Sequence, residues 1–160
     1  MPNAVSVTWV VVMSETLINV KRLYKVFGKN PETILPLIKQ GKSKDNILAD
    51  TGHTVGLKNI NLEIKRGEIF VIMGLSGSGK STLIRHFNRL IDPTAGEIIV
   101  EGTDVMKFSD DELQEFRRHK MSMVFQRFGL MPHISVIENV AYGLNVQQVN
   151  KEKRLAEARK

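Results

Sequence analysis

The alternation of apolar and polar positions divides the chain into short strands and short helices. Residues 16–27 mix β-branched and aromatic side chains with partial alternation, and residues 57–64 alternate apolar and polar side chains. Both segments are therefore predicted to be strands, and Gly28 is predicted to end the first. Residues 29–53 instead carry apolar side chains at helical spacing around a break at Gly41, which predicts a helical insertion between the two strands.

Three further apolar runs are predicted to be strands, and a helix is predicted after the first of them. The runs cover residues 69–73, 97–100 and 121–125, and the first is continuous enough for a buried strand. The helix is indicated by apolar side chains at positions i, i+4 and i+7, expected to face the core: Leu83, Phe87 and Leu90. A strand, a loop and a helix are thus expected to follow one another from residue 69 onward.

Capping signals predict two more helices in the second half of the chain. Ser109 and Ser135 are each followed three residues later by glutamate, the pattern of a capping box. The first helix is expected to run to about residue 118, and the second towards residue 142 with Gly143 as its stop. Residues 150–160 are predicted to form a charged helix with few apolar side chains, which needs a larger structure to pack against.

A glycine-rich segment between the predicted buried strand and its helix carries the main chemical signal. Residues 74–81 read Gly-Leu-Ser-Gly-Ser-Gly-Lys-Ser, which fits the P-loop pattern Gly-x-x-x-x-Gly-Lys-Ser/Thr. A strand before the motif and a helix after it are the context that a P-loop requires. A plain turn rich in glycine and serine is the structural alternative, and the complete spacing argues against it. The segment is predicted to bind nucleotide phosphates.

Each residue type in this loop has a chemical reason. Gly74, Gly77 and Gly79 allow backbone conformations that turn N–H groups toward phosphate oxygens. The start of the helix adds unpaired N–H groups and the positive end of the helix dipole. Lys80 supplies a mobile positive charge, and the Ser81 hydroxyl is placed to ligate Mg²⁺ bound to the nucleotide.

Composition excludes several kinds of site. The chain has 160 residues, enough for one domain or for part of a larger one. It contains no cysteine, so disulfides, thiolate metal sites and cysteine nucleophiles are excluded. The excess of 23 Lys and Arg over 17 Asp and Glu permits an anionic partner but does not choose between a nucleotide, a nucleic acid and a membrane surface.

The apolar run near the N-terminus is too short to cross a membrane. It covers residues 5–13, against the roughly 18 apolar residues that span a bilayer. No charged residue precedes it and no small-residue cleavage site follows it, so it is not interpreted as a signal peptide, and the chain is expected to be cytoplasmic. Because an ordinary polar beginning recurs at Met13, one hypothesis is that residues 1–12 are a spurious extension from an upstream start codon.

The residues after the P-loop resemble the nucleotide-binding subunits of ABC transporters. The motifs that carry this resemblance are Ser-Thr-Leu at 81–83, Leu-Ile-Asp-Pro-Thr-Ala-Gly-Glu-Ile at 90–98, Glu-Gly at 101–102 and Val-Phe-Gln at 124–126. Within that family the chain is similar to the glycine betaine/proline (quaternary amine) importer ATPases. This closer similarity involves residues 70–81, 123–126 and 130–133 and the insertion at 29–53.

The resemblance implies an α/β fold, that of an incomplete P-loop NTPase of ABC type. Residues 13–160 would be the N-terminal part of an ABC ATP-binding domain. This part would comprise the antiparallel β subdomain, the start of the parallel-sheet core and, from residue 127 to 160, the start of the helical subdomain.

The resemblance also implies roles for individual residues. Phe27 matches the aromatic residue that stacks on adenine, with Tyr24 as the runner-up, and Gln126 matches the glutamine that approaches Mg²⁺ and the attacking water. The structural alternatives are a core aromatic for Phe27 and a polar strand end for Gln126. Ser81 and Gln126 would hold Mg²⁺. The residues expected to bind the phosphates of ATP are Gly74, Ser76, Gly77, Ser78, Gly79, Lys80, Ser81 and Thr82.

Several parts of the family's catalytic machinery are not found in this sequence. They are the Leu-Ser-Gly-Gly-Gln signature, the acidic strand with its Mg²⁺-binding Asp and its general base Glu, and the switch histidine. The four histidines lie at other places and are interpreted as surface or packing residues: His53, His86, His119 and His133. The chain alone is therefore expected to bind ATP without hydrolysing it, and to leave apolar surface around Val71 and Ile72 uncovered.

The function implied by the resemblance is ATP hydrolysis that energises import of a compatible solute such as glycine betaine or proline. The implied partners are a second ATP-binding subunit, membrane-spanning permease subunits and, indirectly, a periplasmic or lipid-anchored solute-binding protein. The implied location is the cytoplasmic face of a prokaryotic cell membrane. Two alternatives are a non-catalytic nucleotide-binding fragment or regulator, and a nucleic-acid-associated ABC ATPase. No nucleic acid is expected, because the basic residues 117–120 lie at a helix end, where cations are favoured anyway.

Overall fold

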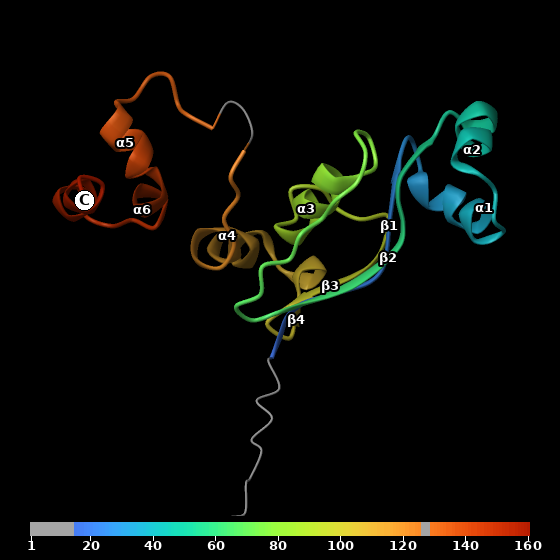
Figure 1. Ribbon diagram of the computed structural model, residues 1–160, viewed down its shortest axis with the longest axis horizontal. Helices are drawn as coiled ribbons and strands as arrows, with labels where there is room; N and C mark the ends of the chain where they lie inside the picture. The colour runs from blue at the N-terminus through green and yellow to red at the C-terminus, as the bar shows by residue number, and fades with distance from the viewer. Residues whose placement is uncertain (1–14, 126–128) are drawn as a thin grey trace, which may run out of the picture.

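A four-stranded antiparallel sheet is the centre of the computed structural model, which describes residues 15–125 and 129–160 (Figure 1). The order of the strands across the sheet is β2-β1-β3-β4. The strands are β1 (Thr16–Phe27), β2 (Thr54–Lys65), β3 (Ala95–Val100) and β4 (Thr103–Asp104). The hypothetical extension over residues 1–12 lies outside the described residues.

The sheet is built around β1. This strand pairs with β2 along one edge and with β3 along the other. Its side chains Val20 and Leu23 are completely buried, because both edges and one face of the strand are covered. The strands predicted over residues 16–27 and 57–64 are confirmed, and Gly28 follows the end of β1 as expected.

The segment between β1 and β2 is helical, as its apolar spacing predicted. It contains η1 (Pro31–Ile34), α1 (Leu35–Lys39) and α2 (Lys44–Thr51), with Gly41 in the break between the last two. These helices lie at one end of the sheet (Figure 1). They form a small second core with the ends of β1 and β2 through the buried side chains Val26, Ile34, Ile38, Ile47 and Val55.

The main core lies between the sheet and the helices α3 (Lys80–Phe87) and α4 (Asp110–His119). Its buried side chains are Ile18, Val20, Leu23, Leu57, Leu83, Phe87, Ile98, Val100, Val105, Leu113 and Phe116. A short helix, η2 (Val105–Lys107), connects β4 to α4. α4 begins with the predicted capping box, in which Ser109 N donates to the Glu112 carboxylate at 2.8 Å. The hydrogen bonds from the backbone and the side chain of Ser109 lower the pKa of Glu112.

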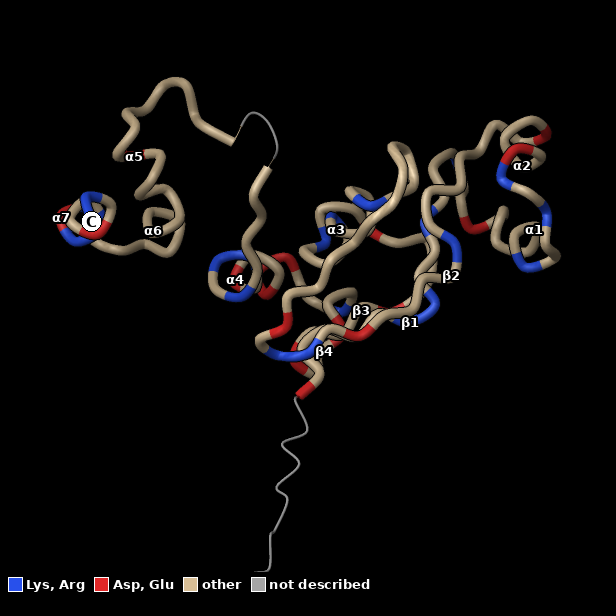
Figure 2. The backbone as a smooth tube through the Cα atoms, in the orientation of Figure 1, with Lys and Arg blue, Asp and Glu red and all other residues tan. Residues whose placement is uncertain are grey.

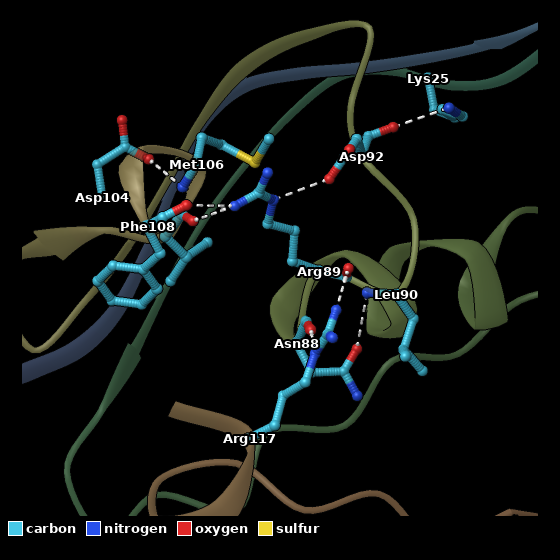
Figure 3. A network of polar contacts seen from close by, with 10 residues as sticks. Lys25, Asn88, Arg89, Leu90, Asp92, Asp104, Met106, Phe108 and Arg117 are labelled. Atoms are coloured by element: carbon cyan, nitrogen blue, oxygen red, sulfur yellow. Dashed lines mark hydrogen bonds and ion pairs between the residues drawn. The ribbon is translucent and has the colours of Figure 1, made fainter. Parts of the chain in front are cut away.

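Two arginines fasten the C-terminal end of α3 to its surroundings (Figure 3). Arg89 pairs with Asp92 Oδ1 at 3.0 Å through Nε and donates to Phe108 O at 2.9 Å through Nη1. Arg117 of α4 donates to Asn88 O at 3.0 Å and to Arg89 O at 2.6 Å. The last carbonyl groups of a helix have no partner within the helix, so these bonds hold the chain where α3 ends.

Three short helices make up the C-terminal part: α5 (Val136–Val140), α6 (Tyr142–Val146) and α7 (Lys151–Glu157). α5 begins with the predicted capping box at Ser135, and α7 lies in the predicted charged segment. The prediction that Gly143 stops the helix after Ser135 is wrong, because α5 ends at Val140 and Gly143 lies inside α6. Gly143 does not adopt the positive φ of a helix-ending glycine.

The helices of the described chain, residues 15–125 and 129–160, include none that is both long and apolar enough to cross a bilayer.

Two of the predicted strands are not strands in the structure. Residues 69–73 and 121–125 have no regular secondary structure, and Ile69 and Val124 are 92% and 97% exposed. A strand needs a neighbour whose backbone groups pair with its own N–H and C=O groups. No strand of the described residues pairs with either segment, so the apolar pattern alone does not produce a sheet there.

The apolar surface expected beside the P-loop is uncovered in part. Val71 is exposed, whereas Ile72 packs against the main core. Leu90, predicted to face the core, is half-exposed because α3 ends before it and Arg89 turns the chain with a φ of 51°.

His86 of α3 is completely buried. Its Nδ1 lies 2.6 Å from Thr82 O and donates to it, while its buried Nε2 has no hydrogen-bond partner among the described residues. Burial lowers the pKa of His86, because the charged imidazolium would lose its hydration. His119 and His133 are exposed and His53 is partly buried, in keeping with their interpretation as surface or packing residues.

The close approach of β3 to β1 at Gly96 leads to a stability prediction. A Cβ at Gly96 would lie 2.5 Å from Arg22 O and 2.6 Å from Leu23 Cα, and φ is +109°. Gly102 also has a positive φ, +80°, but a Cβ added there would meet nothing within 4 Å. Gly102→Ala is therefore a matched control, because it has the unfavourable φ without the steric overlap. We expect Gly96→Ala to lower the free energy of unfolding by about 2 kcal/mol more than Gly102→Ala does, measured by urea unfolding. Equal losses would contradict the steric explanation.

The burial of neutral His86 predicts a pH dependence of stability. Because the folded-state pKa of His86 is lowered, the unfolded chain takes up a proton first as the pH falls. The contribution of His86 to the free energy of unfolding is therefore complete above the unfolded pKa of about 6.5 and is lost as the pH falls below it. Urea unfolding at a series of pH values measures the effect. His86→Leu should remove this part of the pH dependence and the exposed control His133→Leu should not; parallel curves for parent and His86→Leu would contradict the prediction.

Candidate functional site

The predicted P-loop is a tight turn that leads directly into α3. Ser78 N donates to Leu75 O at 3.2 Å and closes the turn. Gly79 is the N-cap of α3 and has a φ of 95°, a conformation that strains residues with a side chain. The predicted succession of loop and helix is therefore confirmed, with Lys80 as the first residue of the helix.

The first turn of α3 receives no capping hydrogen bond from a side chain of the described residues. The helices α2, α4 and α5 differ, because serine hydroxyls accept such a bond at Ser43, Ser109 and Ser135. Gly79 has no side chain for this role, so the first N–H groups of α3 can donate to an external acceptor. Together with the positive end of the helix dipole, these donors fit an anion such as a phosphate group.

Lys80 places a positive charge over the loop. Its Nζ donates to Gly74 O and to Leu75 O, both at 2.7 Å. An ammonium group has three donors: these two bonds hold the side chain against the loop, and the third donor makes only a long contact, 3.5 Å, to Ser78 Oγ, which a ligand oxygen can replace. The arrangement suits the binding of phosphate oxygens by a charge-assisted hydrogen bond.

A cavity of about 520 Å³ joins the P-loop to the ends of β1 and β2. Its described lining consists of Phe27, residues 54–56 and residues 76–82. The structure thus brings Phe27 together with the phosphate-loop residues from Ser76 onward, in a space of the size expected for a small-molecule site. Gly74 lies at the start of the loop and contacts Lys80, while Gln126 lies outside the described residues.

Tyr24, the runner-up for base stacking, does not line this cavity in the described structure. It is half-buried and lines a separate cavity of about 360 Å³ together with Arg22, Leu35 and Lys39. Phe27 remains 41% exposed at the P-loop cavity, so its ring is accessible to a ligand. The geometry favours Phe27 over Tyr24 as the aromatic residue of the site.

Two neighbours of Phe27 were not among the predicted site residues. Gly56 of β2 leaves the space that the ring of Phe27 occupies, since a Cβ there would lie 2.7 Å from Phe27 Cε2. Lys25 Nζ lies 5.2 Å from the centroid of the same ring and donates to Asp92 O at 2.7 Å. Gly56 lies just before the strand predicted over residues 57–64, and a glycine beside an alternating run is a weak sequence signal that could have identified it. No comparable signal identifies Lys25.

Ser81 is exposed in the lining of the cavity, where its hydroxyl is available to a metal ion. The described residues contain no group of three or more His, Cys, Asp or Glu side chains that could hold a metal ion by themselves. A Mg²⁺ ion at Ser81 would therefore take most of its ligands from nucleotide oxygens and water, as Mg²⁺ commonly does.

Comparison with known proteins identifies relatives of the chain. Residues 57–160 match the ABC transporter family. The chain is 51% identical over 141 residues to the glycine betaine/proline betaine transport system ATP-binding protein ProV of Escherichia coli (strain K12), which covers 88% of this chain and 35% of ProV. It is 50% identical over 141 residues to the glycine betaine transport ATP-binding protein OpuAA of Bacillus subtilis (strain 168), covering 88% and 34%. The chain thus spans about a third of the length of these relatives.

A solved structure has a similar fold. The dimeric post-hydrolysis state of the ATP-binding cassette MJ0796 bound to ADP and Pi matches with a TM-score of 0.70 and 32% identity, over 89% of this chain and 54% of that chain. The predicted α/β fold of an incomplete ABC-type cassette is confirmed. The match over residues 57–160, the relatives at about 50% identity and the shared fold together show that this chain belongs to the ABC transporter family.

Proposed function

We propose that the chain is the nucleotide-binding part of an ATPase subunit that energises import of a compatible solute such as glycine betaine or proline. The observation that carries the proposal is the cavity that joins Phe27 to the P-loop. It offers an aromatic surface for a base and a cradle of N–H groups for phosphates in one place. The class of solute is supported by the names of ProV and OpuAA, both glycine betaine transport proteins.

The described residues have distinct tasks in this proposal. The phosphates of ATP lie against the loop from Ser76 to Thr82 and the uncapped start of α3. Lys80 neutralises charge on the β- and γ-phosphates, and Phe27 stacks on adenine. Ser81 would hold Mg²⁺ together with Gln126, which lies outside the described residues, and the ion when bound would offset the negative charge of the phosphates.

We further propose that this chain binds ATP without turning it over. Phosphoryl transfer needs groups that position the attacking water and stabilise charge at the γ-phosphate. None of the described residues that line the cavity is Asp, Glu or His. Hydrolysis is therefore proposed for a whole ATPase subunit. The same observation favours, as a second candidate, a non-catalytic nucleotide-binding fragment or regulator.

The proposed assembly contains two ATP-binding subunits, membrane-spanning permease subunits and, indirectly, a periplasmic or lipid-anchored solute-binding protein. A dimer is supported by the dimeric MJ0796 cassette, and a transporter by the transport system to which ProV belongs. In this assembly the ATP-binding subunit lies on the cytoplasmic face of a prokaryotic cell membrane.

Substitution of Lys80 tests nucleotide binding. Lys80→Ala removes the charge that the loop holds over the proposed phosphate site. We expect the affinity for ATP to fall by about tenfold or more, because a charge-assisted hydrogen bond is lost. Calorimetry measures the affinity, with Lys58→Ala at an exposed position of β2 as the control. Equal ATP affinity in Lys80→Ala and the parent would refute the P-loop assignment.

Substitution of Phe27 tests the base-binding end of the cavity. Phe27→Ala is expected to weaken ATP binding by about 1–3 kcal/mol, the range for stacking of a base on an aromatic ring, while Phe27→Trp is tolerated. Tyr24→Ala is the matched control on the same strand and should leave the affinity unchanged. A loss of this size for Tyr24→Ala with none for Phe27→Ala would transfer the stacking role to Tyr24.

A further inference from the structure

Gly56 lies where a strand ordinarily has a side chain. It is in the interior of β2, between the buried Val55 and Leu57. Its backbone does not adopt the positive φ that calls for glycine elsewhere in the chain. Glycine weakens a strand interior, and its presence there often marks the close approach of another group. The reason for glycine at this position therefore lies in the surrounding space.

The group that approaches Gly56 is the ring of Phe27. A Cβ at Gly56 would lie 2.7 Å from Phe27 Cε2 and 3.4 Å from Phe27 Cδ2. The next contact, Lys25 O at 3.5 Å, is an ordinary van der Waals distance. The ring thus occupies the space that any larger residue at position 56 would need, and a side chain there would push the ring away from β2.

Two further contacts define the place of the ring. Lys25 Nζ lies 5.2 Å from the ring centroid and is itself held by Asp92 O at 2.7 Å (Figure 3). Gly56 O lies close to Gly79 of the P-loop: a Cβ added at Gly79 would be only 2.8 Å from this oxygen. The backbone at Gly56 therefore lies between the aromatic ring on one side and the first turn of α3 on the other.

We propose that Gly56 is a positioning residue for the base of a nucleoside triphosphate. By lacking a side chain it lets the Phe27 ring lie against β2 at the edge of the P-loop cavity, where the ring stacks on a base whose phosphates occupy the loop. The inference rests on the proposed nucleotide binding and assigns Gly56 to the base-binding half of the site alone. Gly56 acts through Phe27 and not through the phosphates.

The test compares ATP with inorganic tripolyphosphate, which has no base. Gly56→Ala is expected to weaken ATP binding about fivefold or more, the lower end of the range for base stacking, and to leave tripolyphosphate binding unchanged, both by calorimetry. Gly143→Ala is the matched control, because a Cβ at Gly143 would meet nothing within 4 Å. It should change neither affinity.

A double-mutant cycle separates positioning from a general structural effect. In the Phe27→Ala background the ring is absent, so Gly56→Ala should cause no further loss of ATP affinity. The same holds for stability. If Gly56→Ala lowers the unfolding midpoint through its overlap with the ring, the double variant should unfold at the midpoint of Phe27→Ala alone. This comparison remains informative even where Gly56→Ala by itself folds poorly.

Three results would overturn the inference: unchanged ATP affinity in Gly56→Ala, an equal loss of tripolyphosphate affinity, or a full Gly56→Ala effect in the Phe27→Ala background. The second result would assign Gly56 to the P-loop through its contact with Gly79. Failure of the proposed function has a different signature. In that case the parent chain binds neither ATP nor tripolyphosphate, or Phe27→Ala binds ATP as tightly as the parent.

Discussion

Backbone pairing along both edges of β1 is the interaction on which the described structure depends. The pairing of Phe27 with Thr54 places the ring beside residues 54–56, at the end of the sheet where the P-loop lies. On the other edge, β3 passes so close to β1 that position 96 has room only for glycine. The same strand ends anchor the helical insertion through Val26 and Val55. One central strand thus organises both cores and one wall of the site.

The phosphate loop is supported from two directions. At the start of α3 the backbone of Gly79 lies against Gly56 O of the sheet. Beyond the end of the same helix, Arg89 donates to Val105 O of η2 and to Phe108 O just before α4 (Figure 3). Arg117 donates to the carbonyl groups of Asn88 and Arg89. Along the backbone, the positions of Lys and Arg and those of Asp and Glu are distributed over several elements, α4 among them (Figure 2). A binding loop is precise only when the elements beside it are fixed. Here the start of α3 lies close to the backbone of β2, and the chain at its end is held by hydrogen bonds from arginine side chains.

Features with local causes were predictable from the sequence, and features that depend on distant partners were not. The P-loop spacing and the capping boxes at Ser109 and Ser135 are local, and the structure contains the turn and the helices that they predict. Residues 69–73 and 121–125 have the composition of strands, but a strand also needs a partner, which no pattern within the segment supplies. For the site, the sequence indicates the loop, and the family resemblance adds Phe27 as the aromatic residue. The contact between Phe27 and Gly56 depends on the register between two strands, which the spacing of residues does not reveal.

The absence of a serine cap on α3 has an energetic consequence. A capping side chain contributes roughly 0.5–2 kcal/mol to a helix, and α3 lacks this contribution while α2, α4 and α5 have it. With the proposed ligand, a phosphate group completes the helix, so part of the folding free energy comes from a molecule that the cell supplies. At a free nucleotide concentration of a hundred times Kd, such binding would raise the free energy of unfolding by about 2.7 kcal/mol. Because proteases cleave the opened form of a chain, the proposed nucleotide, when bound, would also slow proteolysis of this protein.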